Sequence, residues 1–527
     1  MKSSKSILMI LIALVAVALP GELAAQHTRY KLIDIGTFGG PESYVNPAGA
    51  IGSPSILNSS GVVVGGAGTS IPLTMNSSRV ICGGVEGFPW LGVNHALEWQ
   101  NGTLTDLGSL AGPDNCSVAT SINASGEVSG HSENGVIDPV AGFNAFHAVR
   151  WKNGAILDLG TLGGSVSAGS GINKWGQVAG FALNGIPDPV SIYHFQIVGS
   201  TGGTQTRAFL WTNGVMRDLG TLGGPDAWSN FVNDAGQVAG SSYTDSIINP
   251  ATGVPTTHPF LWDEANGMTD LGTLGGTLAS SEVANLQGAL NNLGQVVGGS
   301  YLAGDQTFHP FLWTRPGPMQ DLGTLGGNNA GASAINGAGE VVGTADLPGN
   351  LFHAFRYKNG VMTDLGTLNG YPFSTATSIN AQGQIVGSSC LISCENHFHT
   401  RAVLFENGSI FDLNKLISGG HAGLTLTIAF AINDLGEIAG VGTPPGCLAD
   451  TACSHAFLLI PCAEITQGCE DNAQEATATT QNNSAPVAND SATATSRIPT
   501  PSGIMARARP AQRYHGNVKK CNACENG

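Results

Sequence analysis

The chain has 527 residues, of which 75 are glycine and only 11% are charged, and its formal net charge is −16 at pH 7. A composition so rich in turn residues and so poor in charge excludes coiled coils and other long-helix assemblies. The negative balance argues against nucleic acid and against anionic membrane surfaces, because proteins recognise both through basic patches.

The first 25 residues have the organisation of a secretory signal peptide. Lys2 and Lys5 supply the positive start, residues 7–19 the apolar stretch, and Leu23-Ala24-Ala25 a cleavage site before Gln26. An uncleaved anchor is the alternative, but the apolar run is shorter than the roughly 20 residues that a membrane span needs. We expect a secreted chain, extracellular or periplasmic, without a membrane span after cleavage.

One sequence unit then recurs eight times between residues 30 and 460. Its Asp-Leu-Gly element begins at Asp34, Asp106, Asp158, Asp218, Asp270, Asp321, Asp364 and Asp412. An Asn-x-x-Gly element begins at Asn58, Asn123, Asn173, Asn233, Asn291, Asn336, Asn380 and Asn433. A His-Ala-Phe-x-Trp element begins at His95, His147, Arg207, His258, His309, His353, Arg401 and His455. A period of roughly 45 to 65 residues is typical of solenoids, propellers and arrays.

Each unit predicts four short antiparallel strands. The first is a small-residue segment ending in Ile-Asn, such as Ser167 to Asn173, and the second is Val-rich, such as Gly339 to Gly343. The Asn-x-x-Gly pattern between them predicts a tight turn, because Asn and Gly tolerate positive φ. The His-Ala-Phe-x-Trp segment is the third strand, and an Asn-Gly turn such as Asn153-Gly154 leads to the fourth.

Eight four-stranded units predict an all-β fold, a β-propeller with eight blades. A β-helix would show a shorter period without hairpin turns, and an open array would leave exposed edges at both ends. The first unit begins at its fourth strand, Tyr30 to Phe38, and the last ends at its third, His455 to Ile460. We therefore expect the N-terminal strand to complete the last blade and close the ring. The small-residue strand is expected next to the propeller axis, where strands crowd together.

The units resemble the HAF repeat, a family of extracellular bacterial proteins named after its His-Ala-Phe triplet. The triplet is literal at His353 and His455, and Asp-Leu-Gly-Thr-Leu-Gly-Gly is intact at Asp158, Asp218, Asp270 and Asp321. The resemblance covers about Tyr30 to Ile460 and implies secretion and a repeat fold, with no established reaction. Arg207 and Arg401 in place of His, and the altered unit at Asp412, depart from the pattern.

The repeated Asp and His residues are expected to hydrogen-bond within each blade rather than to form a cation-binding ring around the channel. A catalytic group is needed once per site, whereas a packing device is needed once per blade. By the same logic the recurrent tryptophans are expected in the core between blades. We expect no cofactor and no metal.

Variation concentrates in the connection from strand two to strand three, which is longest in the first four units. These loops carry the candidate ligand-binding residues Phe88, Trp90, Phe143, Tyr193, His194, Phe195 and Tyr243. Aromatics beside small polar residues suit glycan or protein contact, although the same side chains could instead pin the loops to the propeller. Asp138 and Asp188 recur in similar settings of neighbouring loops, and we interpret them as solvated turn residues rather than calcium ligands.

Ten cysteines fit an oxidising compartment. We expect disulfides between the local pairs Cys390 and Cys394, Cys447 and Cys453, and Cys462 and Cys469, while Cys82 and Cys116 remain to pair with each other. Residues 461–527 form a low-complexity tail that we expect to be disordered. The Cys521-x-x-Cys524 motif there lacks the two further ligands of a zinc site.

The sequence therefore predicts a secreted, non-catalytic propeller that binds a glycan or an extracellular protein through the long loops of one face. The alternative is an extracellular carbohydrate-active enzyme, a hydrolase or lyase, on the same scaffold. An enzyme needs two unrepeated carboxylates that converge. The loops offer Glu86, Glu133, Asp138 and Asp188 without a recognisable pairing, so binding is preferred.

Overall fold

The structure is a computed structural model. It describes residues 28–45, 55–78, 82, 92–199, 202–250, 253–280, 289–349, 351–392, 394, 399–419, 423–447, 453–462 and 469. The predicted signal peptide and nearly all of the predicted tail, with Cys521 and Cys524, lie outside these residues. No helix in the described ranges has both the length and the apolar character needed to cross a membrane.

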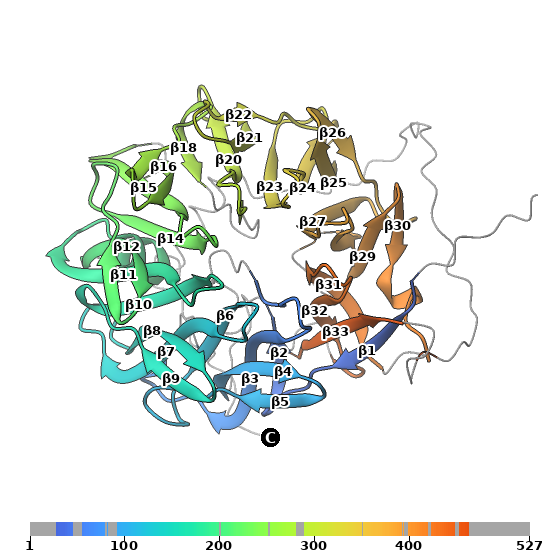
Figure 1. Ribbon diagram of the computed structural model, residues 1–527, viewed down its shortest axis with the longest axis horizontal. Coiled ribbons are helices and arrows are strands. Elements are labelled where there is room, and N and C mark those ends of the chain that lie inside the picture. Colours follow the sequence, from blue (N-terminus) through green and yellow to red (C-terminus); the bar gives the residue numbers. More distant parts are fainter. Residues whose placement is uncertain are drawn as a thin grey trace, which may run out of the picture.

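The described chain is a β-propeller in which four-stranded sheets follow one another around a central axis (Figure 1). Blades 1 to 4 comprise β2 (Gly39–Tyr44), β3 (Val63–Pro72), β4 (Gly92–Gln100) and β5 (Thr103–Asp106); β6 (Ser117–Ile122), β7 (Val128–Ile137), β8 (Asn144–Lys152) and β9 (Ala155–Asp158); β10 (Gly163–Ile172), β11 (Val178–Pro187), β12 (Thr204–Thr212) and β13 (Val215–Asp218); and β14 (Ala227–Val232), β15 (Val238–Ile248), β16 (Pro255–Asp263) and β17 (Gly267–Asp270).

Blades 5 to 8 follow in the same order. They comprise β18 (Gly275–Ser280), β19 (Ala289–Leu290), β20 (Val296–Leu302), β21 (Phe308–Trp313) and β22 (Gln320–Asp321); β23 (Ala330–Ile335), β24 (Val341–Leu347), β25 (Leu351–Lys358) and β26 (Val361–Asp364); β27 (Phe373–Ile379), β28 (Ile385–Cys390), β29 (Thr400–Glu406) and β30 (Ser409–Asp412); and β31 (Thr425–Ile432), β32 (Ile438–Thr443), β33 (His455–Pro461) and β1 (Tyr30–Asp34). Helical turns are η1 (Ile192–Val198) and η3 (Leu413–Lys415).

The hydrogen-bonded sheets number seven, because blades 4 and 5 merge into one nine-stranded sheet. A single parallel pair, Thr257 with Leu278, joins them. Each half keeps its own set of antiparallel strands, so we count the eight sequence units as eight blades.

The N-terminal strand closes the ring, as predicted. β1 pairs antiparallel with β33 from Tyr30 opposite Pro461 to Asp34 opposite Phe457, and Figure 1 shows the two strands side by side at the outside of the last blade. The backbone of Tyr30 also exchanges hydrogen bonds with Leu416 and Ser418. The outer edge of blade 8 is thereby covered by a strand from the other end of the chain.

The small-residue strands lie nearest the axis, as β6, β14, β23 and β31 show in Figure 1. The second strand needs a glycine where it approaches the first strand closely at a bulge. A Cβ on Gly180 of β11 would lie 1.9 Å from the carbonyl oxygen of Ala168 in β10. The same holds for Gly343 of β24 and the Gly331 oxygen, at 2.0 Å.

The two kinds of hairpin turn use asparagine differently. In the Asn-Gly turns between strands three and four, Asn153, Asn213 and Asn359 have φ of 51–52°, as the sequence predicts. In the Asn-x-x-Gly turns between strands one and two, the positive φ falls on the glycine, for example 74° at Gly176. The asparagine of these turns contributes its side chain instead.

The eight asparagines that begin these turns form a closed ring of hydrogen bonds around the axis. Each Nδ2 donates to the backbone carbonyl of the equivalent asparagine in the next blade, at 2.9–3.2 Å. The last link runs from Asn433 back to Asn58, 375 residues away in sequence. Each Oδ1 accepts N–H groups of its own turn; that of Asn336 accepts from Ala338 and Glu340, both at 3.0 Å. All eight side chains are buried.

We predict that Asn433→Ala lowers the free energy of unfolding by about 2–4 kcal/mol, because it leaves several buried backbone groups without partners. Denaturant unfolding followed by circular dichroism measures the change. The control is Leu435→Ala, an exposed side chain in the same turn, for which a change within about 0.5 kcal/mol is expected. Equal stability of the two variants would contradict a structural role for the ring.

Candidate functional site

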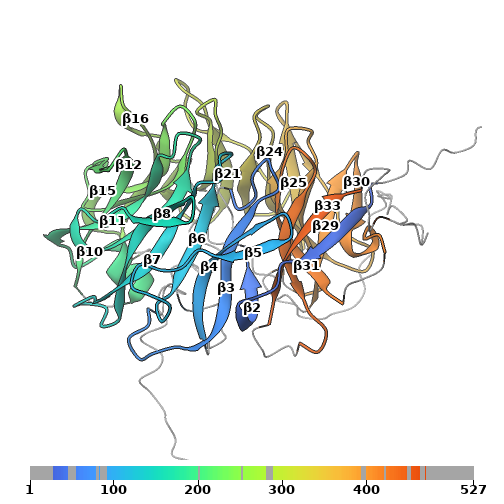
Figure 2. The same cartoon turned by 60° about the horizontal axis from the view of Figure 1, so that its bottom comes forward.

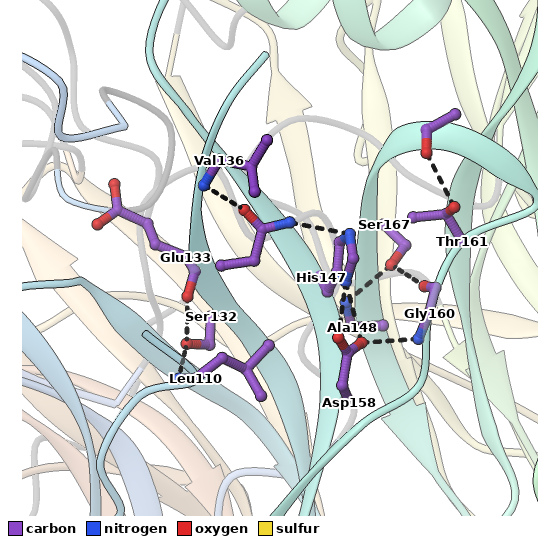
Figure 3. A network of polar contacts seen from close by, with 12 residues as sticks. Leu110, Ser132, Glu133, Val136, His147, Ala148, Asp158, Gly160, Thr161 and Ser167 are labelled. Carbon is purple, nitrogen blue, oxygen red and sulfur yellow. Dashed lines mark hydrogen bonds and ion pairs between the residues drawn. The ribbon is translucent and has the colours of Figure 1, made fainter. Parts of the chain in front are cut away.

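The repeated His and Asp residues form a hydrogen-bonded pair in six of the eight blades, and Figure 3 shows the example in blade 2. Nδ1 of His147 lies 2.9 Å from Oδ2 of Asp158, whose Oδ1 accepts the N–H of Gly160 at 2.8 Å. Ser167 of the next blade accepts the N–H of Ala148 and donates to the Gly160 carbonyl. The equivalent pairs are His95–Asp106, His258–Asp270, His309–Asp321, His353–Asp364 and, across the ring closure, His455–Asp34.

This pairing leaves the carboxylates of these six blades occupied. Burial alone would raise the pKa of Asp158, but the hydrogen bonds from His147 and the Gly160 N–H lower it. Arg207 replaces histidine in blade 3 and binds Asp218 through Nε at 3.0 Å, so this departure from the repeat preserves the contact. The repeated polar residues fasten strands three and four and the crossover to the next blade; they do not converge on a cation.

The first four blades carry extended hairpins between strands two and three. β3, β7, β11 and β15 span 10 or 11 residues, whereas β20, β24, β28 and β32 span 6 or 7. In antiparallel blades these hairpins project from the same rim as the crossovers. Figure 2 shows the ring turned by 60°, with blades 1 and 2 brought forward. We call the four extended hairpins the long-hairpin rim.

A disulfide and a buried carboxylate join the hairpin of blade 1 to blade 2. Cys82 and Cys116 are bonded, with their Cα atoms 5.6 Å apart. Glu133 of β7 accepts the N–H groups of Ser78 at 2.5 Å and Cys116 at 2.8 Å, and burial raises its pKa. Cys82, Cys116 and Glu133 form the one group within the described ranges that has the spacing of metal ligands. The disulfide, however, occupies both sulfurs.

Asp138 joins the hairpin of blade 2 to blade 3. It is buried, which corrects our interpretation of it as a solvated turn residue. Oδ1 accepts the N–H groups of Val140 at 2.8 Å and Ala141 at 2.6 Å, and Oδ2 accepts the hydroxyl of Ser165. Nε2 of His194 lies 3.5 Å from Oδ1. Burial opposes ionisation, but these hydrogen bonds prevail and hold the pKa of Asp138 well below its usual range.

Asp188 joins the hairpin of blade 3 to blade 4, and it too is buried rather than solvated. Its charge acts on Asp226, which accepts the N–H groups of Thr206 at 2.8 Å and Ile192 at 2.5 Å. Burial, and then the charge of Asp188, raise the pKa of Asp226 to about 8. An unrepeated pair of carboxyl groups therefore does meet, but inside the protein, where it caps backbone groups and a substrate has no access.

The outer surface of the rim is aliphatic. Val136, Ile186 and Ile247 occupy equivalent places at the hairpin tips of blades 2, 3 and 4, and are 62%, 56% and 75% exposed. The N–H of each is held by the Asn or Asp two residues before it, at 2.7–2.9 Å. Three consecutive blades thus present the same kind of side chain on the same rigid turn.

The predicted ligand-binding aromatics lie elsewhere. Phe143, Tyr193, His194 and Tyr243 are buried. The ring of Tyr193, in η1, lies 5.8 Å from that of Phe146 in the neighbouring blade. These side chains attach the hairpins to the propeller, and as buried groups they offer no surface to a ligand. Phe88 and Trp90 lie outside the described residues, and the side chain of Phe195 is not among those described. The role of these three in binding stays a prediction.

The local cysteine pairs are bonded as expected. Cys390 with Cys394 and Cys447 with Cys453 staple the shorter second connections of blades 7 and 8, and Cys462 with Cys469 follows β33. Together with Cys82 and Cys116, four disulfides lie within the described residues.

No protein-family model and no curated protein matches the chain. Among solved structures, it is similar to the β-propeller domain of the Trilobed protease from Pyrococcus furiosus, with 8% identity and a TM-score of 0.35 over 65% of this chain and 95% of that one. A Pyrococcus horikoshii acylaminoacyl peptidase gives 10% identity and a TM-score of 0.37 over 76% of this chain and 58% of that one. A Mycobacterium tuberculosis puromycin-hydrolyzing peptidase gives 11% and 0.32 over 67% and 55%. At these scores we draw no functional conclusion from the likeness.

We predict that Asp188→Asn stabilises the protein at alkaline pH. An unfolded Asp titrates near about 3.9, whereas Asp226 in the folded chain titrates at about 8. The unfolded state releases the proton first, so this pair lowers stability as pH rises from about 4 to about 8. Removing the Asp188 charge should raise the unfolding free energy by about 1–2 kcal/mol at pH 9 and change it little at pH 4.

Thermal unfolding at pH 4, 7 and 9 measures this difference. Asp245→Asn is the control, because Asp245 accepts the N–H of Ile247 in the equivalent hairpin of blade 4. A stability gain independent of pH would contradict the raised pKa of Asp226.

Proposed function

We propose that the protein is a secreted binding scaffold of the HAF-repeat family, whose long-hairpin rim docks an extracellular protein. The observation that carries this proposal is the presence of equivalent exposed aliphatic side chains on the rigid hairpin tips of three consecutive blades. Aliphatic side chains at well-ordered positions suit a protein surface. Glycan recognition at this rim is less well supported, since the described aromatics of the loops are buried.

Secretion is supported by the four disulfides of the described chain, which suit an oxidising compartment. A catalytic role draws no support from this rim. Its unusual carboxyl groups, Glu133, Asp138, Asp188 and Asp226, are buried and accept hydrogen bonds from their own loops or from the neighbouring blade. They hold the hairpins of blades 1 to 3 in place, which lowers the entropy cost of binding.

The test places a photo-crosslinker, p-benzoylphenylalanine, at position 186 of the mature chain. Irradiation is carried out with extracellular and envelope proteins of the producing cells. We expect a discrete adduct that excess wild-type chain abolishes and that the triple variant Val136→Ser, Ile186→Ser, Ile247→Ser does not.

The matched control is Val215→Ser with Val361→Ser. These valines are 65% and 61% exposed on the opposite rim, and this variant should compete as well as wild type. No competed adduct, or equal competition by the triple variant, would overturn the proposal. The chain could instead co-sediment with phosphatidylcholine or phosphatidylglycerol vesicles in a way that depends on the three tip residues. In that case the partner of the rim would be a membrane surface rather than a protein.

A further inference from the structure

One Asn-x-x-Gly turn differs from its seven counterparts. The third residue of the turn is Trp175 in blade 3, and elsewhere it is Ser60, Ser125, Ala235, Leu293, Ala338, Gln382 or Leu435. Trp175 is 69% exposed. Residues that pack the repeat recur in every blade. A large exposed aromatic side chain that occurs in one blade alone requires a local explanation.

Trp175 is fixed in place by the turn of blade 4. Its Nε1 donates to the carbonyl of Asp234 at 2.9 Å, and the Nζ of Lys174 lies over the indole, 4.9 Å from its centroid. The backbone N–H of Lys174 donates to Oδ1 of Asp234 at 3.1 Å. The indole is therefore an ordered platform on the surface.

A groove of about 270 Å³ lies beside this platform. Its lining residues are Trp175, Gln177, Leu210, Asp234, Ala235, Gly236, Trp262 and Glu264. They come from the turns and strands of blades 3 and 4, on the rim opposite the long hairpins. The volume is near the lower end of ordinary ligand pockets, about 300–1,000 Å³, so it suits a small ligand or one part of a longer chain.

Charge in and around the groove is balanced. Asp234 is paired with Lys174, with Oδ2 3.7 Å from Nζ, and Glu264 is paired with Arg217. Arg217 also lies over the indole of Trp262, 5.0 Å from its centroid. Two carboxylates thus meet two cations, and the groove offers no net attraction to an anion or to a cation.

We propose that this groove binds an uncharged sugar residue that stacks on Trp175. A sugar has an apolar ring face, which suits an exposed indole, and a hydroxyl rim, which suits carboxylate and amide groups. Asp234, Glu264 and Gln177 supply those groups around the platform. The site is independent of the long-hairpin rim, since it lies on the other face.

Isothermal titration calorimetry of the mature chain tests the proposal. The uncharged probes are the hexasaccharides of β-1,4-glucose, α-1,4-glucose and β-1,4-N-acetylglucosamine. The charged probes are the hexamers of galacturonate and of deacetylated glucosamine. We expect at least one uncharged hexamer to bind and the charged hexamers to bind more weakly.

Variants separate binding from bracing of the turn. Trp175→Ala should raise the Kd at least about tenfold, whereas Trp175→Phe, which keeps an aromatic face but loses the bond to Asp234, should raise it less than about threefold. Leu293→Ala, the matched control in blade 5, should leave it unchanged. If Trp175 only braces the turn, the Trp175→Ala and Trp175→Phe variants lower the melting temperature equally. Their Kd values for the sugar are then the same.

Binding of no uncharged hexamer, tighter binding of a charged hexamer, or an unchanged Kd in Trp175→Ala would each overturn the proposal. The triple hairpin variant should bind the sugar as wild type does. A failure of this site and a failure of the proposed protein-docking rim are therefore distinguishable.

Discussion

Eight buried asparagine side chains, linked head to tail around the axis, are the constraint on which the remaining structure depends. Each side-chain amide donates one hydrogen bond to the next blade and accepts hydrogen bonds from its own turn, so one residue fixes both the turn and the step between blades. The last step, from Asn433 to Asn58, joins residues far apart in the chain. Blade 8 is thus closed twice, by this link at its inner edge and by β1 on β33 at its outer edge. Closure of the ring leaves only the short outer edges of the blades for association with other chains.

The repeated polar residues make the hydrogen bonds that hold this ring together. Residues with a specific function are therefore expected among the unrepeated ones. His147, Asp158 and Ser167 show how completely the repeat is used, because each polar group has a partner in its own or the next blade. What varies around the ring is the length of the second connection and the identity of single turn residues. These two kinds of variation lie on opposite rims, and each marks a different candidate surface.

The sequence predicted the architecture well because an eightfold pattern repeats the same evidence eight times. Strand order, Asn-Gly turns and closure by Tyr30–Asp34 all follow from local periodicity. The candidate site was harder to predict, because burial in a long loop depends on a neighbouring blade. Tyr193 looks like an exposed loop aromatic in sequence, yet it packs on Phe146 of the preceding blade. No local pattern indicates that Asp188 meets Asp226, whereas Trp175 could have been found as a departure from the aligned repeats.

The buried carboxyl groups at the blade boundaries hold the long hairpins to the neighbouring blades. Loops of this length would ordinarily be mobile, and a mobile rim pays entropy when it binds. Here Glu133 and Asp226 accept backbone N–H groups, and Asp138 accepts the hydroxyl of Ser165, across three successive blade boundaries. Burying these carboxyl groups is costly unless those bonds are made. A chain that keeps such groups at each boundary has its hairpins fixed before any ligand arrives. The aliphatic tips of blades 2 and 3 are therefore held in place before binding, rather than lying on independent loops.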